Sequence, residues 1–433
     1  MSVDTPKCLC STTGMSEDNP TNRPKRIFVD ATSWLSQQGR PTGIPRVIEE
    51  IVRRSQGKSA LGTPLGRLFF RRGRWRELTR ATEPMTRISR TSMSRANELQ
   101  LQAAAAAQAG QRFRSLWLRA ARGWHRLRAS LAGRIGGGPR PPLGPGDVIL
   151  SLDMQSACIQ GLTEAVARGA KVVSVVYDCL PLTHPEFFPL PGMRESYVSW
   201  HAWAGRHASG LVAISRTSMR ESIRLQTNTQ CWHAWFHLGG DIPTPPGPLR
   251  PELSVLVGRP TFLMVGTVEP RKNHGLAVAA MEMAWSKGCQ ASLVIIGGKG
   301  WNNQALLARI ASLRAAGRPI IVVHDASDGE LAGVYQAARA LIAASVAEGY
   351  GLPLVEAAAR GVPVLASDIP VFREIAPAGT SFFPLADAEA LARQIERVAA
   401  DPVRRSGQDQ PISWDESMRR LVAIVENDGR TLD

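Results

Sequence analysis

The hydrophobic positions of this chain form short, unbroken apolar runs that alternate with stretches of helical spacing. Residues 26–30 read as a buried strand, and residues 44–54 repeat apolar side chains at the interval of a helix face. A loop containing Gly39, Pro41 and Gly43 lies between them. A strand, a glycine-containing loop and a helix open an α/β unit. The same alternation continues with expected strands at 147–152, 171–177 and 211–214 and a helix near 157–168.

The second half of the chain repeats this alternation more regularly. Apolar runs without a polar alternate predict strands at 261–265, 291–296, 320–323, 340–343 and 362–366. Helical patterns fall at 275–286, 305–315, 329–338, 354–360 and 389–400, and again at 418–426. Strands that are apolar on both faces are typical of a parallel sheet covered by helices on each side.

These patterns predict an α/β fold with two Rossmann-like domains whose parallel sheets face each other across a cleft. The linker at 243–251 holds five prolines and separates the halves. We expect a disordered polar tail at 1–24 and an N-terminal acceptor-side domain at 25–242, with a basic insertion at 71–140. A C-terminal nucleotide-sugar-binding domain is expected at 252–400 and a helical segment at 401–433.

The amino-acid composition indicates the cellular compartment in which the protein is expected. The chain is 44% hydrophobic and 21% charged, as in soluble globular proteins. It contains no apolar run long enough to span a membrane and no apolar stretch of a signal peptide near its start. The six cysteines form no CxxC pair, so a reducing cytoplasm is the simplest expectation.

The positive charge is concentrated in one segment. Residues 71–140 contain 16 Arg and three Glu and so carry +13 of the net +15. Within them, 112–134 has an apolar helical face with Trp117 and Trp124 between arginines, which is typical of a helix on an anionic membrane surface. An ordinary helix packed on the first domain is the alternative. The positive charge alone would be compatible with nucleic-acid binding, but the segment contains no recognition motif, so we expect no nucleic-acid partner.

The strongest candidate for chemistry is the stretch from Glu348 to Glu356. Glu348 follows an expected strand in a glycine-bearing loop, and Glu356 falls in the first turns of the next helix. Glycines let a ligand approach the backbone, helix N-terminal amides point toward phosphate, and carboxylates accept hydrogen bonds from sugar hydroxyls. The structural alternative is a capping carboxylate followed by a solvated helix Glu.

A second candidate follows the first strand of the second domain, at 266–274. Arg271 and Lys272 in this loop are suited to neutralising a diphosphate, including the charge that grows as a leaving group departs. The alternative is an exposed basic turn. The chain has no Asp-x-Asp motif, so we expect no metal.

The second half resembles the retaining glycosyltransferases of family 4, which have the GT-B fold. The matching stretches are 266–274, 295–298, Glu330–Leu331 with Tyr335, 348–356, 359–364 and Glu374. Weaker matches in the first half are Thr42-Gly-Ile-Pro-Arg46, in which Pro45 stands where Gly is more usual, together with 177–182, Ser215 and 238–241.

The resemblance implies a role for each matching residue. Arg271 and Lys272 would bind the donor diphosphate, Glu356 the ribose hydroxyls and Glu348 the donor sugar. The amides of Gly351 and Leu352 would lie near the phosphate or the sugar. Gly266 and Thr267 belong to the phosphate loop, and Gly43 to the loop between donor and acceptor. Asp178 would face the acceptor, with Tyr177 where the family often has His.

The sequence therefore predicts a metal-independent, retaining hexosyltransferase with a nucleotide-sugar donor. The form of the 266–274 loop favours mannose from GDP-mannose, transferred to an oligosaccharide or polyprenyl-diphosphate-linked acceptor in bacterial surface polysaccharide synthesis, at the inner face of the cell membrane. Rhamnose, glucose or galactose donors stay open. So do a nucleotide-sugar epimerase and an inactive, membrane-associated binding module of an assembly complex. A dehydrogenase is disfavoured because no GxGxxG follows an early strand.

Overall fold

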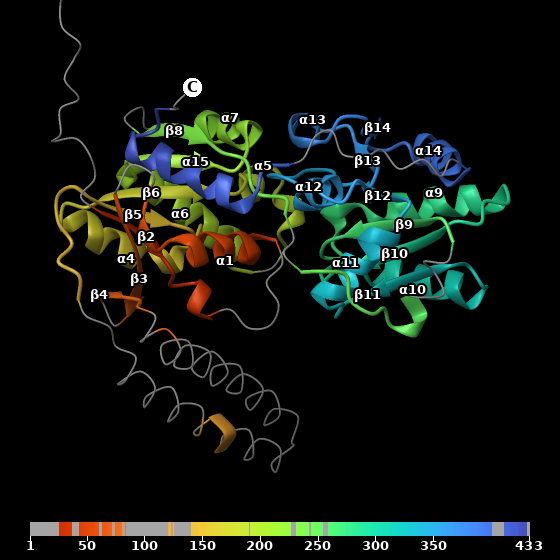
Figure 1. Cartoon of the computed structure of the whole chain (residues 1–433), viewed down its shortest axis with the longest axis horizontal. Coiled ribbons are helices and arrows are strands. Elements are labelled where there is room, and N and C mark those ends of the chain that lie inside the picture. Colours follow the sequence, from red (N-terminus) through yellow and green to blue (C-terminus); the bar gives the residue numbers. More distant parts are fainter. Residues whose placement is uncertain are drawn as a thin grey trace, which may run out of the picture.

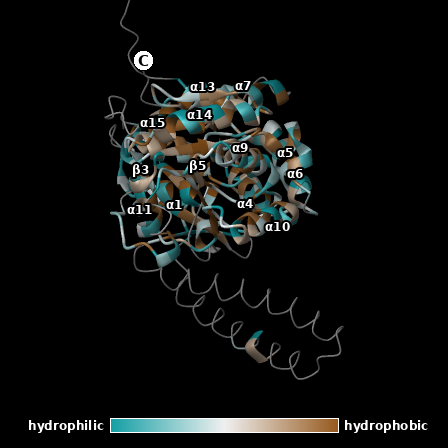
Figure 2. Cartoon of the chain, turned by 90° about the vertical axis from the view of Figure 1, so that its right-hand side faces the viewer, coloured by the Kyte–Doolittle hydropathy of each residue, from teal (hydrophilic) through white to brown (hydrophobic). Residues whose placement is uncertain are grey.

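The computed structural model describes most of both predicted halves. The described residues are 26–36, 43–59, 63–71, 74–79, 83, 120–122, 124, 140–189, 191–226, 231–241, 244–253, 259–400 and 411–430. They form two α/β units side by side, each with a largely parallel sheet between layers of helices (Figure 1). Central strands such as β5, which is buried throughout, are coloured as hydrophobic, whereas hydrophilic residues are mixed into the helices around them (Figure 2).

The first sheet follows the order β2-β3-β1-β5-β6-β7-β8, with β4 paired to β3. Neighbours from β3 to β8 are parallel, whereas β2 and β4 pair antiparallel with β3. Its strands are β1 (Arg26–Asp30), β2 (Gly57–Lys58), β3 (Pro64–Arg71), β4 (Arg74–Glu77), β5 (Asp147–Ser151), β6 (Lys171–Val176), β7 (Gly210–Ala213) and β8 (Trp232–Trp235).

Strands β3 and β4 do not follow from the apolar pattern because arginines interrupt it, and β2 has only two residues, both exposed. Arg67 is nevertheless buried and pairs with Glu83 at 2.9 Å. Trp75 is buried as well and donates its indole N–H to the carbonyl of Gly161 at 2.9 Å. The start of the arginine-rich segment is therefore part of the first sheet.

Helices connect these strands across both faces of the sheet. They are η2 (Trp34–Ser36), α1 (Ile44–Arg54), α4 (Ser156–Ala167), α5 (Leu180–Thr183), η3 (Pro185–Phe187), α6 (Met193–His207) and α7 (Arg216–Leu225). Helix α1 begins after Gly43, which has φ +60°, and Pro45 stands in its first turn, where a missing N–H is tolerated.

The second sheet has the order β11-β10-β9-β12-β13-β14 with every neighbour parallel, as predicted. Its strands are β9 (Thr261–Val265), β10 (Ser292–Ile296), β11 (Ile320–Val323), β12 (Ala340–Ala343), β13 (Val364–Ser367) and β14 (Ser381–Phe383). The helices are η4 (Pro270–Lys272), α9 (His274–Ser286), α10 (Gln304–Ala315), α11 (Asp328–Ala337), α12 (Leu352–Ala358), α13 (Pro370–Ile375) and α14 (Ala388–Ala400).

Strand order in the second sheet reverses direction between β9 and β12. Ligands of doubly wound sheets bind beyond the carboxyl ends of the strands at such a switch point. The loops that leave β9 and β12 there are the two stretches singled out in the sequence. The fold therefore brings both candidates to the position where a ligand is expected.

The last described helix, α15 (Trp414–Glu426), returns to the first unit and contributes to its core (Figure 1). Trp414 is 2% exposed, and its backbone N–H donates to Asp241 Oδ1 at 2.6 Å. A Cβ on Gly239 would lie 2.4 Å from the nitrogen of Trp414, so this approach requires glycine. The C-terminal helix thus ties the end of the chain to the N-terminal unit.

Candidate functional site

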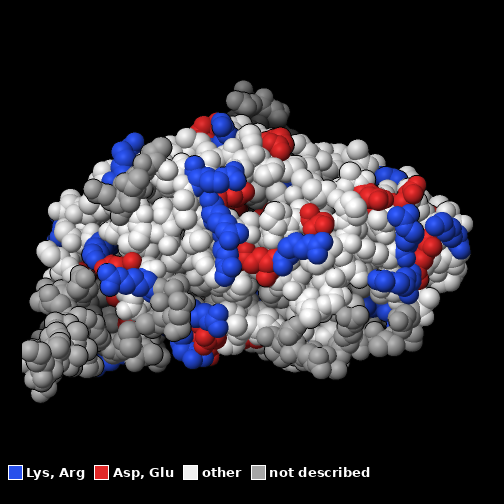
Figure 3. All heavy atoms as spheres, turned by 90° about the horizontal axis from the view of Figure 1, so that it is seen from above, with Lys and Arg blue, Asp and Glu red and all other residues white. Residues whose placement is uncertain are grey.

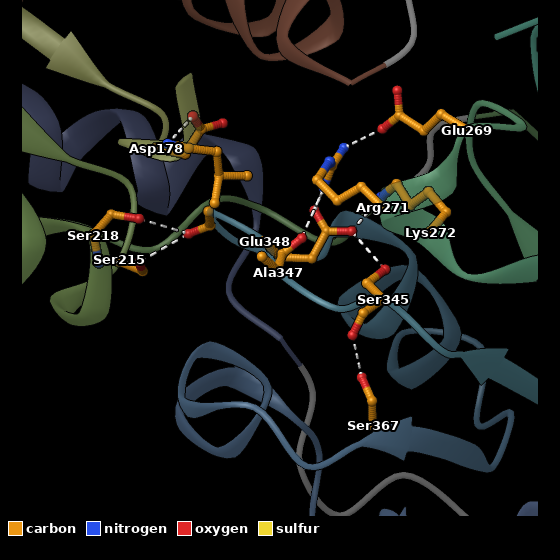
Figure 4. A network of polar contacts seen from close by, with 12 residues as sticks. Asp178, Ser215, Ser218, Glu269, Arg271, Lys272, Ser345, Ala347, Glu348 and Ser367 are labelled. Carbon is orange, nitrogen blue, oxygen red and sulfur yellow. Dashed lines mark hydrogen bonds and ion pairs between the residues drawn. The ribbon is translucent and has the colours of Figure 1, made fainter. Parts of the chain in front are cut away.

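Glu348 is the centre of a buried charge cluster at the switch point of the second sheet (Figure 4). Its carboxylate pairs with Arg271 at 2.7 Å and with the ammonium group of Lys272, and it accepts a hydrogen bond from Ser345 at 2.7 Å. Arg271 also pairs with Glu269 at 2.6 Å. A backbone hydrogen bond of 2.9 Å from Val346 to Arg271 holds the two loops together. The structure therefore brings Glu348, Arg271 and Lys272 into one cluster.

The contacts within the cluster favour the charged forms of Glu348 and Arg271. Burial alone would raise the pKa of Glu348, but Arg271 and Lys272 outweigh it and lower this pKa to about 2. Burial also opposes the charge of Arg271, whereas Glu348, Glu269 and Asp178 raise its pKa above the ordinary value. Two cations and two carboxylates share a volume in which each side chain is at most 17% exposed. An entering anion would meet cations that are already positioned.

The loop after β12 also touches the first unit directly. A Cβ on Gly349 would lie 1.9 Å from the carbonyl oxygen of Tyr177 and 2.8 Å from Cβ of Asp178. The carbonyl oxygen of Gly349 accepts hydrogen bonds from Ser215 at 2.8 Å and Ser218 at 3.1 Å. Glycine is required here because two backbones meet across the units. This contact places Asp178 beside the charge cluster (Figure 4).

Asp178 differs from Glu348 in its ionisation. Burial is the main cause that raises the pKa of Asp178 to about 6, and Glu348 adds to it while Arg271 opposes it. Asp178 Oδ1 accepts a hydrogen bond from the backbone of Leu180 at 3.0 Å. A half-buried carboxyl that titrates near neutrality thus lies on the N-terminal side of the cluster.

Glu356 lies on α12 in a second, separate network. Its side chain is 5% exposed, and Oε2 accepts a hydrogen bond from the hydroxyl of Tyr335 at 2.9 Å. Oε1 pairs with the guanidinium of Arg46, which belongs to the first unit. The predicted site did not include Arg46 or Tyr335. Both stand in stretches that were matched to the family, so the signal was present without an assigned role.

The glycines predicted for ligand binding lie close to these networks. Gly351 (φ +123°) precedes Leu352 at the start of α12 and lines a small pocket with Lys272, Glu348 and His274. Gly266 (φ +142°) follows β9, and a Cβ there would lie 3.2 Å from Cε of Lys272. Thr267 is half-buried beside it, and Gly43 is exposed three residues before Arg46.

A further contact between the units involves Glu374 on α13. Its carboxylate accepts hydrogen bonds from the backbone N–H groups of Arg216 at 2.6 Å and Thr217 at 2.8 Å, at the start of α7. His237 lies 2.9 Å from the same carboxylate. Burial opposes ionisation of Glu374, but these partners lower its pKa to about 2. Glu374 therefore fastens the second unit to the first rather than facing a ligand.

The predicted membrane helix at 112–134 lies outside the described residues, apart from 120–122 and 124; Trp124 is 63% exposed. None of the helices in the described ranges is long and apolar enough to cross a bilayer. No group of three or more His, Cys, Asp or Glu within those ranges is placed to hold a metal ion. On the face seen from above, charges of both signs are interspersed (Figure 3).

Comparison with known proteins agrees with this arrangement. Residues 249–412 match the family described as glycosyl transferases group 1. The serotype-specific mannosyltransferase WbdA of Escherichia coli is 32% identical over 269 residues, which are 58% of this chain and 33% of WbdA. The O-antigen chain mannosyltransferase B of Escherichia coli is 26% identical over 274 residues, or 59% of this chain and 70% of that protein. This chain thus spans about a third of the length of WbdA.

Solved structures share the fold. The crystal structure of Anabaena Alr3699/HepE in complex with UDP and glucose covers 94% of this chain and 97% of its own, with a TM-score of 0.53 and 14% identity. The predicted fold, two Rossmann-like units in the GT-B arrangement, is confirmed. This chain thus carries a domain at residues 249–412 that matches the glycosyl transferases group 1 family, within a GT-B fold.

Proposed function

We propose that this protein transfers a hexose from a nucleotide-sugar donor to an oligosaccharide acceptor. In this proposal the hexose is mannose and the donor is GDP-mannose. The observation that carries the proposal is the charge cluster of Glu348, Arg271 and Lys272 at the switch point of the C-terminal sheet. The names of two relatives, a serotype-specific mannosyltransferase and an O-antigen chain mannosyltransferase, support the choice of sugar.

In this proposal the loops at 266–274 and 348–356 bind different parts of the donor. Arg271 and Lys272 hold the diphosphate, and Glu348 releases them in part to take hydroxyls of the donor sugar. The backbone at Gly351 and Gly266 approaches the phosphates closely because glycine carries no side chain, and the amides of Leu352 and Thr267 follow directly. Glu356 accepts hydrogen bonds from the ribose, as its orientation by Tyr335 favours.

The acceptor enters from the N-terminal side, past Gly43 and Asp178. The bond from the sugar C1 to the phosphate oxygen breaks while a bond from C1 to the acceptor oxygen forms on the same face. The acceptor proton passes to the departing phosphate oxygen, so the anomeric configuration is retained without an enzyme nucleophile. The protein contributes position and charge: Arg271 and Lys272 stabilise the negative charge that grows on the diphosphate. No metal is part of this scheme.

We further propose that the acceptor is linked to a polyprenyl diphosphate and that the protein works at the inner face of the membrane, held by 112–134. The wild-type protein should bind to anionic vesicles, and a variant with both Trp117 and Trp124 replaced by Ala should not bind. Wild-type protein that stays unbound at low salt would refute the membrane contact.

A panel of GDP-, UDP- and dTDP-sugars tests the activity itself. Release of nucleoside diphosphate in the presence of an oligosaccharide acceptor, with the product anomer identified by NMR, is the expected result, and GDP-mannose should be turned over fastest. Transfer from a rhamnose, glucose or galactose donor instead would replace the donor assignment. Absence of any transfer and of any nucleotide binding would refute the enzyme and favour a binding module.

A further inference from the structure

Arg46 crosses from the first unit to the proposed ribose site of the second. It stands in the first turn of α1, directly after the loop that leaves β1. Its guanidinium pairs with Glu356 Oε1, 310 residues away, and the side chains are 17% and 5% exposed. Such a buried ion pair is costly to desolvate and gives little net stability, so its value lies in fixing a geometry.

The other arginines of α1 show that this contact is not a general feature of the helix. Arg53 pairs with Glu49 on α1 itself. Arg54 pairs with Glu50 and with Asp415 on α15, which packs in the first core. All three pairs lie within the first unit. Packing of α1 is provided by its buried apolar face, for example Val47 and Ile51, and does not need Arg46.

The contacts of Glu356 do not use all of its hydrogen-bond acceptor positions. Tyr335, which is fully buried, donates to Oε2, and Arg46 donates to Oε1. A carboxylate has about four lone-pair positions, so about two remain for hydroxyl donors. With one partner on each oxygen, the plane of the carboxylate is fixed before a ligand arrives. The orienting partner on one of these oxygens comes from the opposite unit.

We propose that Arg46 is a positioning residue for the donor nucleoside: it orients Glu356 across the cleft so that ribose binding depends on the two units being together. This inference rests on the proposed function, because it assigns the ribose to Glu356. It makes nucleoside affinity, rather than diphosphate affinity, sensitive to a residue of the acceptor-side unit.

Isothermal titration of the full chain with GDP and with inorganic pyrophosphate separates the two parts of the ligand. Arg46→Ala should weaken GDP binding about tenfold, as for the loss of a charged hydrogen bond, and leave pyrophosphate affinity within about twofold. Arg46→Lys should lie between wild type and Arg46→Ala. Arg53→Ala removes the same charge from the same helix outside the cleft and should change neither affinity.

The double variant Arg46→Ala/Glu356→Gln tests whether Arg46 acts through Glu356. In the Glu356→Gln background, loss of Arg46 should cause little further loss of GDP affinity, because coupled residues are not additive. If Arg46→Ala weakened the binding of GDP and of pyrophosphate equally, Arg46 would act only as a general positive charge, and the inference would be overturned. So would unchanged GDP affinity in both Arg46→Ala and Arg46→Lys. Wild-type protein that binds pyrophosphate but neither GDP, UDP nor dTDP would instead refute the proposed donor site, and this inference with it.

Discussion

Replacing Glu348 by Gln removes one negative charge and almost no volume. The carboxylate is 9% exposed and lies between Arg271 and Lys272, each 17% exposed. In the variant, Arg271 keeps its ion pair with Glu269, whereas Lys272 loses the pair with Glu348. Breaking one side of a buried ion pair is destabilising because the remaining charge keeps its desolvation cost.

The size of the effect follows from the ionisation of Glu348. Its pKa falls from the ordinary 4.5 to about 2. At about 1.4 kcal/mol for each pKa unit, the native protein favours the carboxylate by roughly 3 kcal/mol. We expect Glu348→Gln to lower the free energy of unfolding by about that amount at pH 7. For a domain of 150–250 residues, this corresponds to a Tm lower by roughly 6–12 °C.

The same substitution should strengthen binding of an anion. In the wild-type protein Glu348 competes with a diphosphate for Arg271 and Lys272. Without it, inorganic pyrophosphate should bind about tenfold more tightly, while hexose transfer falls because the sugar loses its carboxylate contact. Because the folded pKa of Glu348 is depressed, its stabilisation is present above about pH 4.5 and is lost as the pH falls toward 2. The stability gap should therefore narrow in acid.

Urea unfolding at several pH values and titration calorimetry with pyrophosphate measure both effects. Glu330→Gln is the matched control: Glu330 pairs with Arg250 at 2.7 Å, and this arginine is the main cause that lowers the pKa of Glu330 to about 2. The control should lose stability without a gain in pyrophosphate affinity. A Glu348→Gln protein as stable as wild type, or one that binds pyrophosphate no more tightly, would refute the reasoning.

Three further predictions follow from the same contacts. Lys272→Ala should fold, since Arg271 still pairs with Glu348, but transfer hexose at least about tenfold more slowly; unchanged turnover of purified protein would contradict its role on the diphosphate. Gly349→Ala places a Cβ 1.9 Å from the carbonyl oxygen of Tyr177 and should destabilise the native arrangement by about 1–3 kcal/mol, measured by urea unfolding together with the radius of gyration from solution scattering. Asp178→Asn should become more stable relative to wild type as the pH rises from about 4 through 6, because burial raises the folded pKa of Asp178 to about 6 and its ionisation disfavours folding; parallel pH profiles of the two proteins would contradict this.

The local pattern was sufficient for most elements of the second unit. The apolar run at 291–296 is predicted as a strand and forms β10 (Ser292–Ile296), which is buried throughout, and the ends of α9 and α14 lie within a residue of those predicted. The pattern failed at β3 and β4, where polar residues interrupt it although the side chains of Arg67 and Trp75 are buried. Their burial depends on partners such as Glu83 and the carbonyl of Gly161, which are distant in the sequence or carry no hydrophobic signal.

The sequence by itself determined the alternation of strands and helices and the two loops that carry Glu348, Arg271 and Lys272, since these depend on neighbouring residues and on their order along the chain. Only the tertiary structure decided that Lys272 and Arg271 share Glu348, that Gly349 meets Tyr177, that α15 completes the first core, and that Arg46 reaches Glu356. Each of these contacts joins residues more than 70 positions apart. Their formation depends on how the two sheets are placed, which local periodicity does not encode.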